Sequence, residues 1–194
     1  MEDFILASQS PRRKLLLEWA ELPFEIIVRA TDESFPMDMP ITEVPIHIAK
    51  QKAVAVQAHL ETAFHKKYIG KTILAADTIV VLDGVVIGKP KDRSDAIAIL
   101  TALSGKTHQV ITGVVIVHSK GEITFSDITE VQFHALTQDQ IVFYVDKYAP
   151  YDKAGAYAIQ EWIGVVGIAS IAGDFYNVMG LPVSRVVQAL RTIE

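Results

Sequence analysis

The chain contains no cysteine among its 194 residues. Disulfides, thiolate metal sites and cysteine nucleophiles are therefore excluded, which fits a reducing compartment. Long apolar runs are also missing, since none reaches the roughly 18 residues that a membrane-spanning helix needs. The first residues lack the basic and apolar regions of a signal peptide. We therefore expect a soluble, cytoplasmic protein.

An excess of positive charge is lacking too, because the formal net charge is −5 at pH 7. Nucleic acids and anionic membranes favour diffuse positive charge, so we expect neither as a stable partner. Any anion must instead be bound by local cations. Hydrophobic residues make up 50 % of the chain and charged residues 21 %. This balance is typical of a globular chain. The length suits one domain or two small lobes, and we expect a single domain over residues 1–194.

Several catalytic and nucleotide-binding motifs are absent. The chain has no Gly-x-x-x-x-Gly-Lys-Ser/Thr, no Gly-x-Gly-x-x-Gly and no His-Glu-x-x-His sequence. Without cysteine or a Gly-x-Ser-x-Gly motif, covalent catalysis has little support. The histidines are scattered without metal-ligand spacing, which favours surface or structural roles for all of them: His47, His59, His65, His108, His118 and His134.

The first fifteen residues carry the strongest local pattern. The apolar residues 4–7 predict a buried strand, and Ser10 and Pro11 predict the N-cap and first position of a helix. Arg12 and Arg13 follow in the first turn, where the helix dipole disfavours cations. One interpretation is a solvated basic face. The order of strand, cap, proline and arginines favours the other, a site for phosphate or carboxylate.

Strands and helices are expected to alternate along the rest of the chain. Apolar patterning and turn residues predict strands over residues 22–28, 73–82, 85–87, 110–117, 123–133 and 163–171. Helices are predicted over residues 12–20, 44–60, 94–103, 138–147 and from 183 onward, with Ser94 and Thr137 as N-caps of two of them. This interleaving indicates an α/β or mixed α+β fold with a substantial sheet.

Asp77 is the most informative single residue, because it interrupts the apolar run over residues 73–82. Burying an unpaired carboxylate is costly. Asp77 is therefore either part of a buried ion pair or a strand-end carboxylate facing a cleft, where it binds a hard cation or activates water. Thr78 beside it either positions a ligand or satisfies strand propensity.

Two loops carry further candidates. Lys89 lies in Gly88-Lys89-Pro90, a stiff turn, although a single lysine there is often only solvated. In residues 151–160, small residues bracket Asp152, Lys153 and Gln160, which allows a ligand to approach the backbone closely. The alternative is an ordinary glycine-containing turn.

Four segments, in this order, together resemble the Maf family, the septum-formation-inhibitor-like nucleoside triphosphate pyrophosphatases. The resemblance extends from the first strand to the last helix. The segments are Leu6-Ala7-Ser8-Gln9-Ser10-Pro11-Arg12-Arg13, Ala76-Asp77-Thr78 with Gly88-Lys89-Pro90, Asp152-Lys153-Ala154-Gly155-Ala156-Tyr157, and Gly180-Leu181-Pro182.

The resemblance implies a mixed α/β fold of two lobes around a deep central cleft, shared with the inosine triphosphate pyrophosphatases. It also implies hydrolysis of a nucleoside triphosphate to monophosphate and pyrophosphate, and a homodimer. Asp77 matches the proton acceptor, and a divalent cation, Mg²⁺ or Mn²⁺, is expected on Asp77 and Glu33. The other implied substrate-binding residues are Ser8, Arg12, Arg13, Lys52, Thr78, Lys89, Asp152, Lys153 and Gln160.

Arg12, Thr78 and Gln160 match positions tied to base choice, and Gln160 resembles the branch acting on dTTP and UTP. A neutral amide donates to a pyrimidine O4 and accepts from N3–H, whereas a carboxylate only accepts. That branch usually has glycine after the glutamine, but here Glu161 follows, and its Cβ restricts the local backbone. Alternatives are a pyrophosphatase for purine or modified nucleotides and a non-catalytic nucleotide-binding regulator of cell division.

Overall fold

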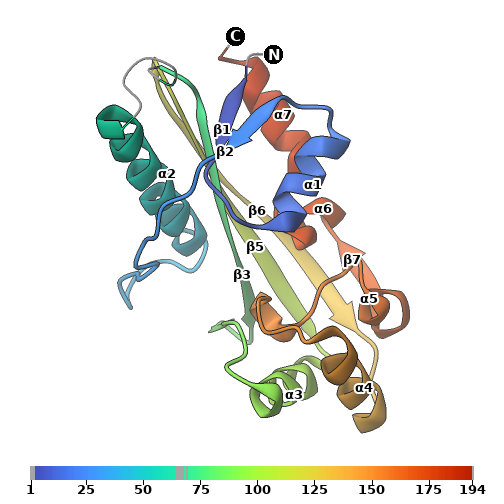
Figure 1. Cartoon of the computed structure of the whole chain (residues 1–194). Coiled ribbons are helices and arrows are strands. Elements are labelled where there is room, and N and C mark those ends of the chain that lie inside the picture. Colours follow the sequence, from blue (N-terminus) through green and yellow to red (C-terminus); the bar gives the residue numbers. More distant parts are fainter. Residues whose placement is uncertain (1–2, 64–67, 69, 194) are drawn as a thin grey trace. The chain divides into compact units, whose positions relative to one another are not determined.

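The computed structural model describes residues 3–63, 68 and 70–193, so the prediction made for His65 lies outside the described residues. Strands form a seven-stranded mixed sheet in the order β2-β1-β3-β5-β6-β7 (Figure 1). Strand β4 pairs with β3. The strands are β1 (Phe4–Leu6), β2 (Phe24–Ile26), β3 (Ile73–Leu82), β4 (Val85–Ile87), β5 (Thr107–His118), β6 (Gly121–Phe133) and β7 (Ile168–Ala172).

Helices alternate with these strands, which confirms the predicted mixed α/β class. They are α1 (Pro11–Trp19), α2 (Val44–Ala63), α3 (Arg93–Leu103), α4 (Gln138–Tyr148), the 3₁₀ helix η1 (Ala154–Ala156), α5 (Trp162–Gly167), α6 (Phe175–Met179) and α7 (Val183–Arg191). Within the described ranges, no helix is both long and apolar enough to cross a membrane.

The chain divides into two compact units. The first unit comprises residues 1–77, 112–127 and 180–194, and the second comprises residues 78–111 and 128–179. The strands β3, β5 and β6 each contribute to both units, because the divisions fall inside them. The single domain and the central cleft stay predictions.

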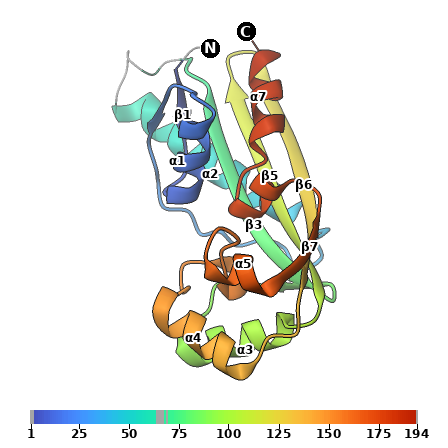
Figure 2. The same ribbon diagram turned by 90° about the vertical axis from the view of Figure 1, so that its right-hand side faces the viewer.

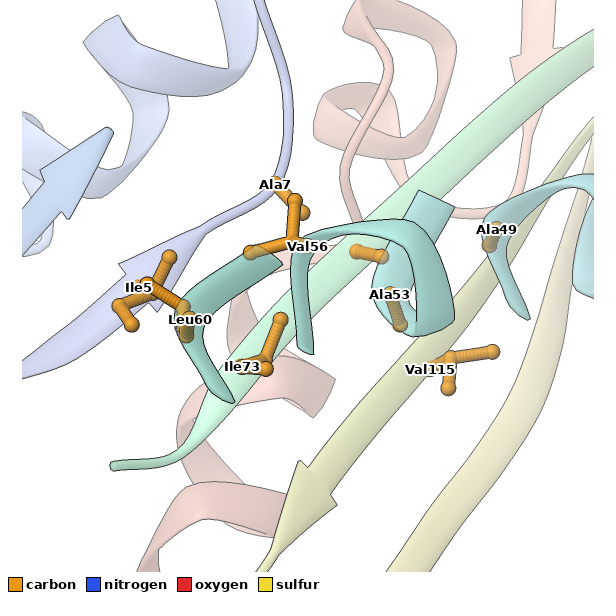
Figure 3. Packing of buried hydrophobic residues seen from close by; sticks show 9 residues of the cluster. Ile5, Ala7, Ala49, Ala53, Val56, Leu60, Ile73 and Val115 are labelled. Atoms are coloured by element: carbon orange, nitrogen blue, oxygen red, sulfur yellow. The ribbon is translucent and has the colours of Figure 1, made fainter. Parts of the chain in front are cut away.

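The first unit has its core between α2 and the sheet. Strand β1 pairs in parallel with β2 and with β3. The apolar residues of α2 recur at helical spacing, so they form one buried stripe that packs on β1, β3 and β5. Figure 3 shows this cluster of Ile5, Ala7, Ala49, Ala53, Val56, Leu60, Ile73, Ala75 and Val115.

Helix α1 begins where the sequence predicts. Ser10 is the N-cap, its hydroxyl accepts a hydrogen bond from the Arg13 backbone N–H, and Pro11 occupies the first helical position. Leu16 and Leu17 are the buried apolar residues of this helix. The start of α1 is therefore encoded locally, by a capping side chain and by a proline at a position where a backbone N–H would have no partner within the helix.

The second unit contains the β3–β4 hairpin and a pair of packed helices, α3 and α4 (Figure 2). Asp83 and Gly84 have φ of 51° and 78°, as a two-residue hairpin turn requires. Thr137 is confirmed as the N-cap of α4, where it forms a capping box with Gln140. The prediction of Ser94 as a cap is wrong, because the Asp92 carboxylate accepts from the Asp95 N–H and begins α3 earlier.

The predicted strand over residues 163–171 is wrong in its first half, which forms α5. Gly164 N–H donates to the Glu161 carbonyl at 2.9 Å. A Cβ on Gly164 would lie 1.7 Å from the Ile159 carbonyl oxygen, so only glycine allows this tight turn into the helix. The strand begins at Ile168, where antiparallel pairing with β6 starts. An apolar run of this length does not distinguish helix from strand by its pattern.

Candidate functional site

In the first unit, Arg13 connects the end of β1 with the segment before α7. Its Nη1 donates to Ser8 Oγ at 3.1 Å, and its Nε donates to the Gly180 carbonyl at 2.7 Å. Ser8 and Arg13 are both buried, and the Ser10 N–H also donates to Ser8 Oγ at 3.2 Å. The motifs around Ser8, Arg13 and Gly180 therefore form one hydrogen-bonded group at the start of α1.

Electrostatics connect this group to two carboxylates. Burial lowers the pKa of Arg13, while Asp77 raises it, the neighbouring Arg12 lowers it and Glu33 raises it. A guanidinium remains charged under all these influences. The N-terminus of α1 thus carries two cations, and the negative charges of Asp77 and Glu33 stabilise the charged form of Arg13.

Lys52 of α2 bridges those two carboxylates. Its Nζ lies 2.6 Å from Asp77 Oδ1 and 2.9 Å from Glu33 Oε1. The Lys52 and Asp77 side chains are each only 15 % exposed. Asp77 therefore forms the ion pair that one of its two interpretations predicted, because a cation lies within hydrogen-bonding distance of its carboxylate.

Glu33 reaches Lys52 from a strained loop. Its φ is 55°, a left-handed conformation that non-glycine residues rarely adopt. The next residue is fixed by α2, since Gln51 Nε2 donates to the Ser34 carbonyl at 3.1 Å. Gln51 and Lys52 together hold the loop in the position that presents the Glu33 carboxylate.

Asp77 and Glu33 have the chemistry that a divalent cation requires. Both offer carboxylate oxygens, the ligands that Mg²⁺ and Mn²⁺ prefer. Because both contact the same ammonium, their oxygens converge on one place, and the two charges exceed that of Lys52. Among the residues that the structure describes, no group of three or more His, Cys, Asp or Glu could hold a metal ion. A divalent cation on this pair would need further oxygen ligands, such as water or phosphate oxygens.

In the second unit, the loop of Lys89 lies beside the segment that begins at Asp152. The Gly155 N–H donates to the Gly88 carbonyl at 3.2 Å. Gly155 has φ of 71°, and a Cβ there would lie 3.0 Å from the Val80 side chain. The close packing of residue 155 against Val80 therefore depends on glycine. Lys153 is 8 % exposed and its Nζ lies 2.7 Å from Asp152 Oδ1, whereas Lys89 is exposed.

Gln160 presents its side chain to solvent from a tight turn. The Glu161 N–H donates to the Ala158 carbonyl at 3.1 Å and closes the turn. Glu161 has φ of −96° and ψ of 179°, an extended conformation that any residue adopts. Its Cβ therefore imposes no strain on the neighbouring Gln160.

Sequence reasoning did not anticipate the contacts of two residues in this region, the Tyr144 hydroxyl and the Glu161 carboxylate. The Tyr144 hydroxyl donates to Glu161 Oε2 and accepts from the Ala158 N–H at 3.1 Å. The carboxylate of Glu161 directly after Gln160 was the available signal. The sequence around Tyr144 carries no signal of its hydrogen bonds, because the residue has the pattern of an ordinary core position of α4.

The predicted site residues come from both units. The first unit brings together Ser8, Arg12, Arg13, Glu33, Lys52 and Asp77. The second unit contains Thr78, Lys89, Asp152, Lys153 and Gln160. Thr78 is partly buried in β3, directly after Asp77.

Comparison with known proteins gives concordant matches. The family described as "Maf-like protein" matches residues 3–193. A "dTTP/UTP pyrophosphatase" of Cytophaga hutchinsonii is 47 % identical over 188 residues, covering 97 % of this chain and 83 % of that protein. A protein of the same name from Bacteroides thetaiotaomicron is 44 % identical over 192 residues, covering 97 % and 95 %. The one from Porphyromonas gingivalis is 42 % identical over 188 residues, covering 96 % and 92 %.

Proposed function

Because the chain belongs to the Maf-like protein family, we propose that it hydrolyses dTTP and UTP to the nucleoside monophosphate and pyrophosphate. One observation carries this proposal: proteins named dTTP/UTP pyrophosphatase are 42–47 % identical to the chain over nearly its whole length. The cations and carboxylates gathered in the first unit supply the chemistry that such a reaction needs.

In the proposed reaction, a water oxygen attacks the α-phosphorus. The bond from the α-phosphorus to the oxygen that bridges it to the β-phosphate breaks, and pyrophosphate leaves. Asp77 orients the water and accepts its proton, which later passes to solvent. Lys52, 2.6 Å away, fixes the orientation of the Asp77 carboxylate.

The triphosphate is assigned to the basic end of α1 and to Lys52. Backbone N–H groups and the positive dipole end of a helix favour phosphate, and arginines add charge-assisted donors. Ser8 and the Gly180 carbonyl hold the Arg13 guanidinium in one orientation. Arg12, which is partly exposed, is assigned to direct phosphate contact and base choice.

Asp77 and Glu33 are proposed to hold a divalent cation, Mg²⁺ or Mn²⁺. When bound, this cation neutralises charge on the triphosphate and on the departing pyrophosphate. Glu33 contributes from its strained loop, and Lys52 keeps both carboxylates convergent.

The residues of the second unit are assigned to the nucleotide as well. Lys89 and Lys153 supply cations, and Asp152 orients Lys153. Gln160 reads the pyrimidine, because its amide matches the O4 acceptor and N3–H donor of thymine and uracil. Thr78 contributes to base choice.

A substrate panel tests the function. Canonical and modified nucleoside triphosphates are incubated with Mg²⁺, and both pyrophosphate and monophosphate are measured. We expect the highest kcat/KM with dTTP and UTP, and equal amounts of the two products. Preference for a purine or modified nucleotide would support the alternative pyrophosphatase. Nucleotide binding without pyrophosphate release would support a regulator of cell division.

The proposal includes three further points about the protein in the cell. It acts in the cytoplasm, residues 1–194 work as a single domain, and the protein is a homodimer. Light scattering on a size-exclusion column measures the molar mass in solution. A mass of twice the 21.4 kDa chain is expected, and the mass of one chain would refute the dimer.

A further inference from the structure

The hydroxyl of Tyr144 is placed to hold the turn that carries Gln160. Tyr144 lies in α4 and is fully buried. Its hydroxyl accepts from the Ala158 N–H at 3.1 Å and donates to Glu161 Oε2. A phenol has one proton to donate, so this donor is committed to Glu161.

Ala158 and Glu161 are the first and last residues of the turn that contains Gln160. The backbone hydrogen bond from Glu161 N–H to the Ala158 carbonyl closes that turn at 3.1 Å. Residues 155–159 are buried, whereas Gln160 is exposed. Tyr144 therefore holds both ends of a turn whose outward-facing residue is Gln160.

The second oxygen of Glu161 faces Lys153. Glu161 Oε1 lies 3.6 Å from Lys153 Nζ, and Lys153 is 8 % exposed. Asp152 approaches the same ammonium at 2.7 Å. Glu161 thus joins the Gln160 turn, through its carboxylate, to the ammonium of the Asp152-Lys153 segment.

From this arrangement we propose that Tyr144 and Glu161 are positioning residues for Gln160 and thereby set the preference for uracil and thymine over cytosine. This inference rests on the proposed function. The Gln160 amide must present its N–H to O4 and its oxygen to N3–H. Cytosine has the reverse pattern, an amino donor at C4 and an acceptor at N3, so discrimination depends on a fixed amide. A loosened turn lets the amide move or rotate, and selectivity falls while the chemical step is unaffected.

The test compares kcat/KM for UTP with kcat/KM for CTP in Tyr144→Phe and Glu161→Gln. Tyr144→Phe keeps the ring and removes both hydrogen bonds. We expect the UTP:CTP ratio to fall about tenfold, the size of one lost hydrogen bond to a charged group, through a higher KM for UTP. Glu161→Gln keeps an acceptor for Tyr144, so a smaller fall is expected. Tyr148→Phe is the matched control, because it removes a hydroxyl from the ring stacked on Tyr144 in the same helix.

A double-mutant cycle separates positioning from general destabilisation. If the two residues act as a pair, Tyr144→Phe changes the ratio little in a Glu161→Ala background. Thermal unfolding is recorded for each variant. An unchanged UTP:CTP ratio in Tyr144→Phe, or equal losses with both nucleotides, overturns the inference.

A failure of the proposed function is distinguishable from a failure of this inference. If the wild-type protein releases no pyrophosphate, the function fails, and the same variants are compared by calorimetry with the α,β-imido analogues of UTP and CTP. A reduced ratio of the two affinities in Tyr144→Phe supports the positioning role without turnover. An unchanged ratio refutes it.

Discussion

Lys52 and Asp77 form a largely buried ion pair in which Nζ lies 2.6 Å from Oδ1 and each side chain is 15 % exposed. The same ammonium lies 2.9 Å from Glu33. A pair so little exposed fixes the direction of its carboxylate more firmly than a surface pair does, because water screens it less. Asp77 therefore has both an ion-pair partner and a defined orientation. An ion pair with Lys52 is compatible with the other interpretation of Asp77, a carboxylate that binds a cation or activates water.

Asp77→Asn is expected to lower kcat for pyrophosphate release by about 10²- to 10⁴-fold, the usual contribution of a general base. Binding of the α,β-imido analogue of UTP, measured by calorimetry, should persist because the shape of the side chain is kept. Asp83→Asn is the matched control. Asp83 has φ of 51°, which asparagine tolerates, and it pairs with Lys106. Near wild-type turnover in Asp77→Asn would refute the assignment.

Lys52→Ala leaves two carboxylates facing each other without their shared cation. We expect the free energy of unfolding to fall by about 1–3 kcal/mol, between the values for exposed and buried pairs. KM for UTP should rise. Urea unfolding and steady-state kinetics measure the two effects. Adding Asp77→Asn to Lys52→Ala should recover part of the stability, because it removes one of the two negative charges that Lys52 no longer separates. An additive loss would contradict coupling of the pair.

Arg13→Lys is expected to lower the free energy of unfolding by about 1–2 kcal/mol, because a lysine ammonium does not reproduce the fork that reaches Ser8 and Gly180 together. Urea unfolding measures this change. Arg12→Lys, the same substitution at the neighbouring and more exposed position, is the control and should cost less. Equal costs at the two positions would show that the contacts of Arg13 contribute little.

Arg12→Ala is expected to raise KM for dTTP and UTP, since the variant removes a cation from the proposed phosphate-binding end of α1. kcat should change less than KM, because Asp77, the proposed general base, is untouched. Raising the salt concentration should increase KM in the wild-type protein more than in the variant. An unchanged KM in Arg12→Ala would return this arginine to the solvated-face interpretation.

His108 predicts acid sensitivity of the fold. It is 2 % exposed, and burial lowers its pKa from 6.5 to about 4. Its Nε2 shares a hydrogen bond of 2.7 Å with the Tyr157 hydroxyl, whose pKa burial raises. Below pH 6.5 the unfolded chain binds a proton that the folded protein resists binding. The contribution of His108 to the free energy of unfolding is therefore complete above pH 6.5. It is lost as the pH falls towards 4, by roughly 3 kcal/mol in total.

Urea unfolding at pH 7.5 and pH 5 measures this loss, of which about 2 kcal/mol is expected by pH 5. His108→Gln should abolish that part of the pH dependence, whereas His134→Gln, at an exposed position, should retain it. An equal pH dependence in wild-type protein and His108→Gln would refute the prediction.

Local signals in the sequence predicted much of the fold. The N-caps at Ser10 and Thr137 and the short connection between the strands over residues 73–82 and 85–87 depend on residues a few positions apart, so they can be predicted from the chain. The prediction of a strand over residues 163–171 was wrong in its first half, because the apolar pattern of this segment suits helix and strand alike. The choice was made by the contact of Gly164 with Ile159 and by pairing of the strand from Ile168 with β6.

The sequence by itself determined the class of fold, the family resemblance and the identity of the candidate residues, because these depend on composition, periodicity and local motifs. Only the tertiary structure decided the partners: Lys52 for Asp77 and Glu33, Ser8 and Gly180 for Arg13, and Tyr144 for the turn of Gln160. The physical reason is distance along the chain. Hydrogen bonds and ion pairs between remote residues depend on folding to bring both groups together, and no local pattern encodes which pair will meet.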